Sequence, residues 1–345
     1  MATTLPNFTK QMDDAFTETW YNVREEAIDN ILDATVVTAT LREMGSFVTQ
    51  VGERDITRSI KYGNQRGTAV QKGDILGQGE PQLETVARWN WRYLAGHIQR
   101  SIFDDQQNQG PMKIKDYVAK RMTDMRDGLE QDIEDRFSAA EVTDESGKLI
   151  QGLNDIVPAT IANRASGTYG GINRPTAYDV AAATAGLSKP SAGNTWWGPR
   201  YFRGNTPKTV HLVDDMTSFF NSISRNRENP NLILCDQGLF ELYESFSQQS
   251  TQLVKEADTH LADLGYTVLR FKGQRMVWSE DATTDHMLFL NTNHVEVVYD
   301  PTLWFEMTEF KPIALQGERI AHILLAMNVV SGQLRRHGRL HYTNT

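Results

Sequence analysis

The side chains that most often do chemistry, histidine, cysteine and the carboxylates, are dispersed along this chain. The eight histidines are spread from residue 97 to residue 341, and the densest set of metal-ligand types is Asp281, Asp285, His286 and His294. A metal site needs such ligands to converge on one point. The stretch SEDATTDH around them is typical of a solvated turn between two strands, so we predict no metal site. Cys235, in the apolar run LILC, is predicted to be a buried apolar side chain.

The sequence also lacks the motifs of common cofactor and nucleophile sites. Gly77 and Gly79 lack the third glycine and the helix of a phosphate-binding loop, so they are predicted to be turn residues. No GxSxG nucleophile elbow is present, although a Ser-His-Asp triad is defined by geometry and stays open. We therefore predict no catalytic residues and no cofactor, and keep a hydrolase or a lectin-like binder as an alternative.

Arg335, Arg336 and Arg339, with His337 and His341, form the one concentrated basic stretch. The net charge of -9 disfavours a protein that coats nucleic acid, because phosphate neutralisation requires a surplus of Lys and Arg. We predict that this stretch faces another subunit or solvent, with nucleic-acid contact as the alternative, and that duplex DNA is bound weakly.

Length and composition indicate a folded globular protein. The chain has 345 residues, 39% of them hydrophobic and 23% charged, which suits about two domains. No apolar run of about 18 residues occurs, and residues 1–10 lack the pattern of a signal peptide, so we expect neither a membrane span nor secretion. A single cysteine excludes an intrachain disulfide.

Periodicity predicts the remaining elements. Amphipathic helices are expected within 12–44, ended by Gly45, and within 206–224 and 237–249. Strands are expected at 231–236, 276–279, 287–291 and 295–299, followed by apolar stretches at 320–330 and 333–341. Mixed, non-alternating elements of this kind favour an α+β fold.

Residues 54–94 predict a long β-hairpin. Residues 54–64 and 83–94 alternate, and the segment between them is rich in glycine, which indicates an extended tip. The alternation places Trp89, Trp91 and Tyr93 on one face. A two-stranded ribbon cannot bury such a face by itself, so we predict that a neighbouring subunit covers it.

Residues 111–140 predict a long helix with an apolar stripe and a proline at its start. Its basic residues crowd the first half and its acidic residues the second, which opposes the helix macrodipole. Two interpretations are open: solvated faces without a partner, or pairing with complementary charges on another subunit.

The order of these elements resembles the tailed-bacteriophage major capsid proteins of the Hong Kong 97-like fold. KGDILGQGEPQLETVARWNWRYLAGHIQRS (72–101) is similar to the family's extended loop, and DYVAKRMTDMRDGLEQDIEDRFSAA (116–140) to its spine helix. GLNDIV (152–157), TYGGINRP (168–175) and WWGPRYF (196–202) are similar to its axial domain. Residues 264–281, 287–301 and 333–341 are similar to its last strands.

The resemblance implies a domain order. Residues 1–53 would form an N-terminal arm with helices, 54–94 the extended β-hairpin loop, and 95–150 the first part of a peripheral domain with the spine helix at 111–140. Residues 151–285 would form the axial domain, and 286–345 the closing strands of the peripheral domain. The hairpin begins near residue 54, which leaves no room for a large N-terminal scaffolding segment, so a separate scaffolding protein is expected.

The implied function is a shell subunit in the virion, assembled in the host cytoplasm. Homo-hexamers and homo-pentamers would tile an icosahedral head that encloses double-stranded DNA without strong direct binding, with a portal protein at one vertex and room for a decoration protein. An encapsulin-like shell around a cargo enzyme is the alternative. The candidate intersubunit contacts are charged and aromatic residues of the hairpin and the long helix: Arg66, Lys72, Glu84, Arg88, Trp89, Trp91, Tyr93, Lys120, Arg121, Asp132, Glu134 and Asp135.

Overall fold

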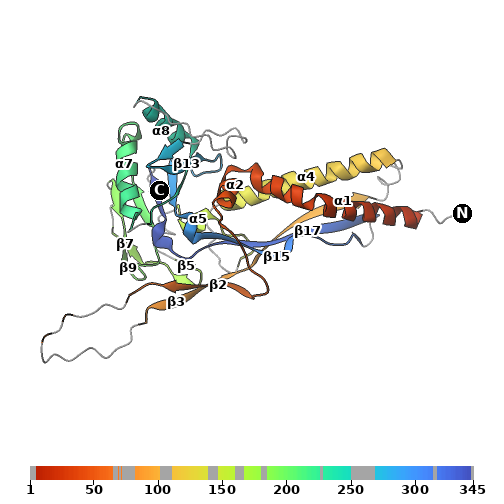
Figure 1. Cartoon of the computed structure of the whole chain (residues 1–345), viewed down its shortest axis with the longest axis horizontal. Coiled ribbons are helices and arrows are strands. Elements are labelled where there is room, and N and C mark those ends of the chain that lie inside the picture. Colours follow the sequence, from red (N-terminus) through yellow and green to blue (C-terminus); the bar gives the residue numbers. More distant parts are fainter. Residues whose placement is uncertain are drawn as a thin grey trace.

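The structure, a computed structural model, describes most of the chain (Figure 1). The described residues are 5–64, 69, 71, 82–101, 111–138, 147–159, 167–179, 185–225, 228–249, 269–313 and 317–342. The main parts of the described chain are two sheets, a projecting hairpin and two long helices.

The chain begins with two helices, as the sequence predicts. Helix α1 spans Leu5–Ala34 and α2 spans Val36–Glu43, separated at Thr35, whose extended backbone interrupts the helical run. Gly45 follows α2 with a positive φ of 73°, which only glycine adopts readily, and this conformation ends the helix. Strand β1 (Phe47–Thr49) then pairs with β15.

The first sheet, called the long sheet here, contains five described strands. Strands β15 (Val295–Met307) and β17 (Glu318–Ser331) form its antiparallel centre, flanked by β1, β16 (Lys311–Pro312) and β4 (Arg92–Ser101). β15 is longer than predicted because it continues past Asp300 and Pro301 through a bulge at which Phe305 has a φ of +53°. Figure 1 shows α1 and α4 side by side over this sheet.

Helix α4 (Pro111–Ser138) is the predicted long helix and extends about 42 Å. Met125, Leu129, Ile133 and Phe137 of its apolar stripe are buried, as their spacing predicts. A Cβ atom at Gly96 of β4 would lie 3.3 Å from the Leu129 side chain, so glycine lets the helix and the strand approach closely.

The second sheet contains seven described strands in the order β12-β13-β11-β14-β18-β10-β8. They are β12 (Leu269–Phe271), β13 (Gln274–Trp278), β11 (Leu232–Cys235), β14 (His286–Leu290), β18 (Gly338–His341), β10 (Arg200–Arg203) and β8 (Gly186–Ser188). Helices α7 (Lys208–Ile223) and α8 (Gln237–Gln249) pack on one face, as predicted from their periodicity. All four residues of β11 are buried, Cys235 among them, which confirms that prediction.

The predicted domain border at residue 285 falls inside this sheet. Strands β14 and β18 pair with β11 and β10, although both were assigned to the peripheral domain. The reason is long-range: the chain leaves the sheet after β14, forms β15 to β17, and returns as β18. The division into axial and peripheral parts remains a prediction, with β14 and β18 on the axial side.

Short elements join the hairpin to the seven-stranded sheet. The hairpin strands are β2 (Asp55–Lys61) and β3 (Glu84–Asn90), paired antiparallel from Asp55–Asn90 to Lys61–Glu84. The connecting elements are α5 (Leu153–Ile156), β5 (Thr168–Tyr169), β6 (Ile172–Asn173), β7 (Ala177–Tyr178) and β9 (Pro190–Ala192), with short 3-10 turns η1 (Thr292–His294) and η2 (Leu334–Arg336) beside β15 and β18.

Candidate intersubunit surfaces

One face of the hairpin is covered by its own subunit. Ile56, Ile60, Ala87 and Trp89 are buried, and Trp89 is only 3% exposed. The indole packs edge-on to Tyr169 at 5.6 Å, and a Cβ atom at Gly170 would lie 2.7 Å from it. The prediction that a partner must cover Trp89 is therefore wrong, because the β5–β6 turn covers it within the chain.

The predicted aromatic face is broken at Trp91. Strand β3 ends at Asn90 and β4 begins at Arg92, so Trp89 and Tyr93 do not share one continuous strand. Trp91 is half-buried and donates a hydrogen bond from Nε1 to the Glu53 carbonyl at 2.9 Å. Of these three aromatic residues, Tyr93 is the most exposed, at 64%.

The outer face of the hairpin carries the exposed candidates. Glu84 and Arg88 are exposed on β3, on either side of Val86, which is 50% exposed. An ion pair links the hairpin to the long sheet: the Arg58 guanidinium of β2 lies 2.6 Å from the Glu296 carboxylate of β15. The surface of Glu84, Val86 and Arg88 is called the outer hairpin face here. Tyr93 lies on β4, where it pairs with Ala326 of the long sheet. Arg66 and Lys72 lie outside the described residues.

Helix α4 presents its exposed charges as predicted, with one exception. Lys120, Arg121, Asp132 and Asp135 are exposed. Glu134 is buried, and the Thr38 hydroxyl of α2 donates a hydrogen bond to it at 3.3 Å. The expectation that Glu134 contacts another subunit is wrong, since α2 covers it within the chain.

The environment of Glu134 favours its neutral form. Burial, aided by the nearby charge of Asp281, raises the pKa of Glu134 to about 7, although hydrogen bonding by Thr35 and Thr38 opposes the shift. Burial, together with Asp135 and Glu280, also raises the pKa of Asp281. These carboxylates lie where α2, α4 and the seven-stranded sheet meet.

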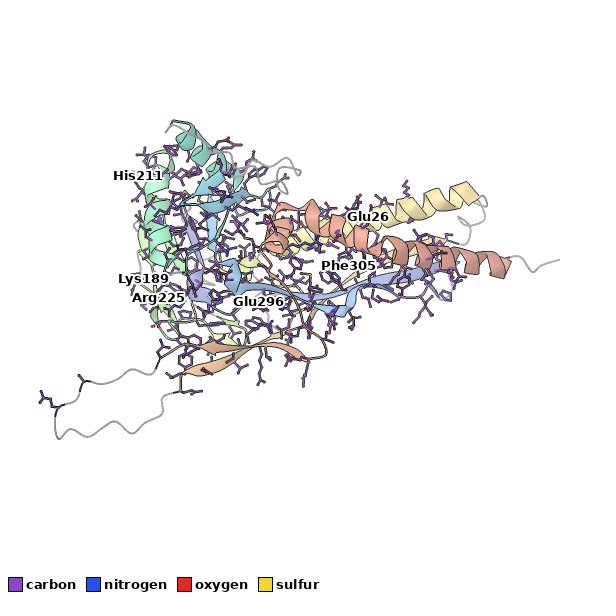
Figure 2. The ribbon with its side chains drawn as sticks, viewed as in Figure 1. Glu26, Lys189, His211, Arg225, Glu296 and Phe305 are labelled. Carbon is purple, nitrogen blue, oxygen red and sulfur yellow. The ribbon has the colours of Figure 1, made fainter. Side chains whose placement is uncertain are left out.

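The sequence did not reveal how firmly α1 is attached to the long sheet. Arg100 of β4, 1% exposed, pairs with Asp13 of α1 at 2.7 Å, and its guanidinium lies 5.2 Å from the Phe310 ring centre. Burial raises the pKa of Asp13 against the attraction of Arg100. Further along α1, Trp20 Nε1 donates to the Phe305 carbonyl at 3.2 Å. Figure 2 shows Phe305 beneath α1. An Asp in an amphipathic helix carries no sequence signal for such a partner.

The predicted basic stretch of residues 335–341 is only partly exposed. Arg339, His337 and His341 are buried, while Arg335 and Arg336 are partly exposed. Arg339 donates to the Val157 carbonyl at 2.7 Å and contacts His286 Nδ1 at 2.9 Å. Burial lowers the pKa of His337 to about 3, so this ring is neutral. The prediction is wrong for these three residues, because β18 lies between β14 and β10 in the seven-stranded sheet and is buried along its whole length.

The four residues considered as metal ligands do not converge. Residues 279–285 form the predicted turn, Asp285 pairs with Lys208, and His294 lies beside Glu228 at the far end of β14. Within the described ranges, no three His, Cys, Asp or Glu side chains are placed to hold a metal ion. No helix in the described part of the chain is both long and apolar enough to cross a membrane.

Comparisons with known proteins identify the fold. The capsid of cyanophage A-1(L) aligns over 87% of this chain and 91% of that chain, with a TM-score of 0.61 and 16% identity. The capsid of Myoviridae phage XM1 aligns over 87% and 91%, with a TM-score of 0.50 and 8% identity. An encapsulin complex from Synechococcus elongatus aligns over 88% and 88%, with a TM-score of 0.48 and 9% identity. No family model and no curated protein sequence matches the chain.

The protein is therefore an α+β protein with the Hong Kong 97-like capsid fold. The N-terminal helices, the hairpin, the long helix and the later helices and strands occur in the order that the sequence predicted.

Proposed function

We propose that this protein is the major capsid protein of a tailed bacteriophage, a subunit whose function is association and not catalysis. The observation that carries the proposal is the likeness to the cyanophage A-1(L) capsid over 87% of this chain, with a TM-score of 0.61. The outer hairpin face supports it, because a ribbon that is anchored to its own subunit and exposes Val86 is suited to contact a neighbour.

In the proposed assembly, hexamers and pentamers of the chain close into an icosahedral head around double-stranded DNA. A separate scaffolding protein, a portal protein at one vertex and a decoration protein are the proposed partners, and the virion is the proposed location. The net charge of -9 supports enclosure of DNA without strong binding to it.

Electron microscopy of the purified protein, with analysis of what the particles contain, tests this function. Closed polyhedral particles with nuclease-protected DNA from infected cells are expected. Uniform monomers at high concentration would contradict a shell function. Particles that enclose a cargo enzyme, formed without a packaging apparatus, would instead support the encapsulin-like alternative.

The hairpin is the proposed clasp between subunits, and its tip can be tested separately. Replacing residues 65–82 by a short Gly-containing turn should abolish closed shells, while circular dichroism and melting of the free subunit stay unchanged. A length-matched Gly/Ser replacement of the same residues is the control that separates reach from specific contacts. Intact shells in normal yield from the shortened variant would exclude the tip as a clasp.

A further inference from the structure

Charges of opposite sign that make no described ion pair lie at the two ends of the seven-stranded sheet. The pairing shows that β10, β18, β11 and β13 run in one direction. The amino ends of these strands therefore lie together at one end of the sheet, and their carboxyl ends lie together at the other. Sheets have small net dipoles, so the polarity described below comes from side chains.

A cavity of about 440 Å³ lies between the amino ends of these strands and the base of the hairpin, and it is called the basic hollow here. Its lining includes four cations, Lys61, Arg225, Arg335 and Arg336, and two aromatic rings, Tyr62 and Trp196. The rings stack at 4.6 Å and join the hairpin to the sheet. Figure 2 shows Arg225 on the side from which the hairpin leaves the body.

The charges of the basic hollow are poorly neutralised. Glu228 pairs with Arg336 at 2.8 Å and also lies 3.3 Å from His294, so one carboxylate serves both. Within the described ranges, Lys61, Arg225 and Arg335 make no ion pair. Burial, followed by repulsion from Arg225 and Arg336, lowers the pKa of nearby Arg200. Guanidinium groups held this close favour a carboxylate or phosphate ligand.

The carboxyl end of β13 carries exposed charges of the opposite sign. Glu280 and Asp281 follow β13, and Asp135 of α4 lies close enough to raise the pKa of Asp281. Among the described residues, these three carboxylates, called the acidic end here, make no ion pair. Glu280, Asp281 and Asp135 are all exposed or nearly so.

The acidic end and the basic hollow lie at opposite ends of the sheet within one chain. The four residues of β11 alone separate the two ends of the sheet by roughly 13 Å. Two complementary surfaces at opposite ends of one subunit make a heterologous contact between copies, and such contacts close into rings when the rotation fits.

We propose that the basic hollow is a docking site for the acidic end of a neighbouring copy of this chain. The inference rests on the proposed function and adds to it the pair of surfaces that hold adjacent subunits in a capsomer. Charge complementarity argues for this occupant, because each surface bears uncompensated charge in the free subunit and both are neutralised together.

A charge-swap experiment in the full chain tests the proposal. Arg225→Glu/Arg335→Glu and Glu280→Arg/Asp281→Arg are each expected to lower shell yield by about tenfold or more, since each places like charges in contact. The fourfold variant should recover to within about threefold of the wild type. Lys148→Glu/Lys311→Glu, which reverses two exposed charges outside both surfaces, is the matched control and should assemble normally.

A second measurement does not depend on yield. Arg335→Cys/Glu280→Cys should give covalent oligomers on a non-reducing gel after oxidation of assembled shells, and Cys235 does not interfere because it is buried. Absence of these oligomers, or a fourfold variant that fails to recover while each double variant folds, would overturn the proposal. So would duplex DNA binding that Arg225→Glu/Arg335→Glu removes without any effect on assembly, since the hollow would then be a nucleic-acid site. If wild-type protein forms no shells, the proposed function itself fails.

Discussion

The hairpin and the seven-stranded sheet bury their side chains to different extents. The sheet is covered on both faces: Ile233, Met276 and Phe289 pack under α7 and α8, and Leu234 and Val277 face the main core. The hairpin is covered on one face alone, with Trp89 buried and Val86 half-exposed on the same strand. The comparison separates residues that stabilise the subunit from residues that remain available to another chain.

Trp89 and Tyr93 give the sharpest test of this difference, and the largest expected effect. Trp89→Ala removes a buried indole and should lower the free energy of unfolding by about 3–5 kcal/mol. Tyr93→Ala removes an exposed ring and should change it by no more than about 0.5 kcal/mol, while reducing shell yield. Denaturant unfolding of the free subunit and particle yield measure the two effects. Equal destabilisation by both substitutions would show that the two rings do not differ in this way.

A smaller effect is expected where α2 and α4 meet the seven-stranded sheet. The pKa of Glu134 is about 7 when folded against 4.5 for the ordinary side chain, so the folded state holds a proton that the unfolded state has released. Stability should therefore fall by roughly 3 kcal/mol at most as pH rises from 4.5 to 7. Glu134→Gln should remove this dependence, whereas Asp132→Asn, at an exposed site, should retain it. Parallel pH profiles of Glu134→Gln and the wild type would contradict the assignment.

The smallest change in subunit stability is expected on the exposed face of α4. Asp132→Lys/Asp135→Lys places positive charge near the carboxyl end of the helix, which should stabilise the free subunit by less than about 1 kcal/mol. The same variant should hinder assembly if these charges pair with another subunit, and Glu134 is left unchanged because it is buried. Melting temperature and particle yield together decide. An unchanged particle yield would mean that the two carboxylates are solvated and have no partner on another subunit.

The sequence by itself determined the main helices, the hairpin and their order. Apolar residues at helical spacing predicted the stripe of Met125, Leu129, Ile133 and Phe137, and the run LILC predicted the fully buried β11. Such patterns are local: the period of the apolar residues specifies the element whatever covers it.

Only the tertiary structure decided which polar and aromatic side chains are covered. Alternation shows that a strand has two faces, but not that the turn at Gly170 closes over Trp89, or that α2 covers Glu134. The same reason explains why Arg335 and Arg339, four residues apart in one basic run, lie in a surface hollow and in the core. Burial of these residues depends on segments far away in the sequence, and the opposite charge of the two sheet edges became visible only when the strands were paired.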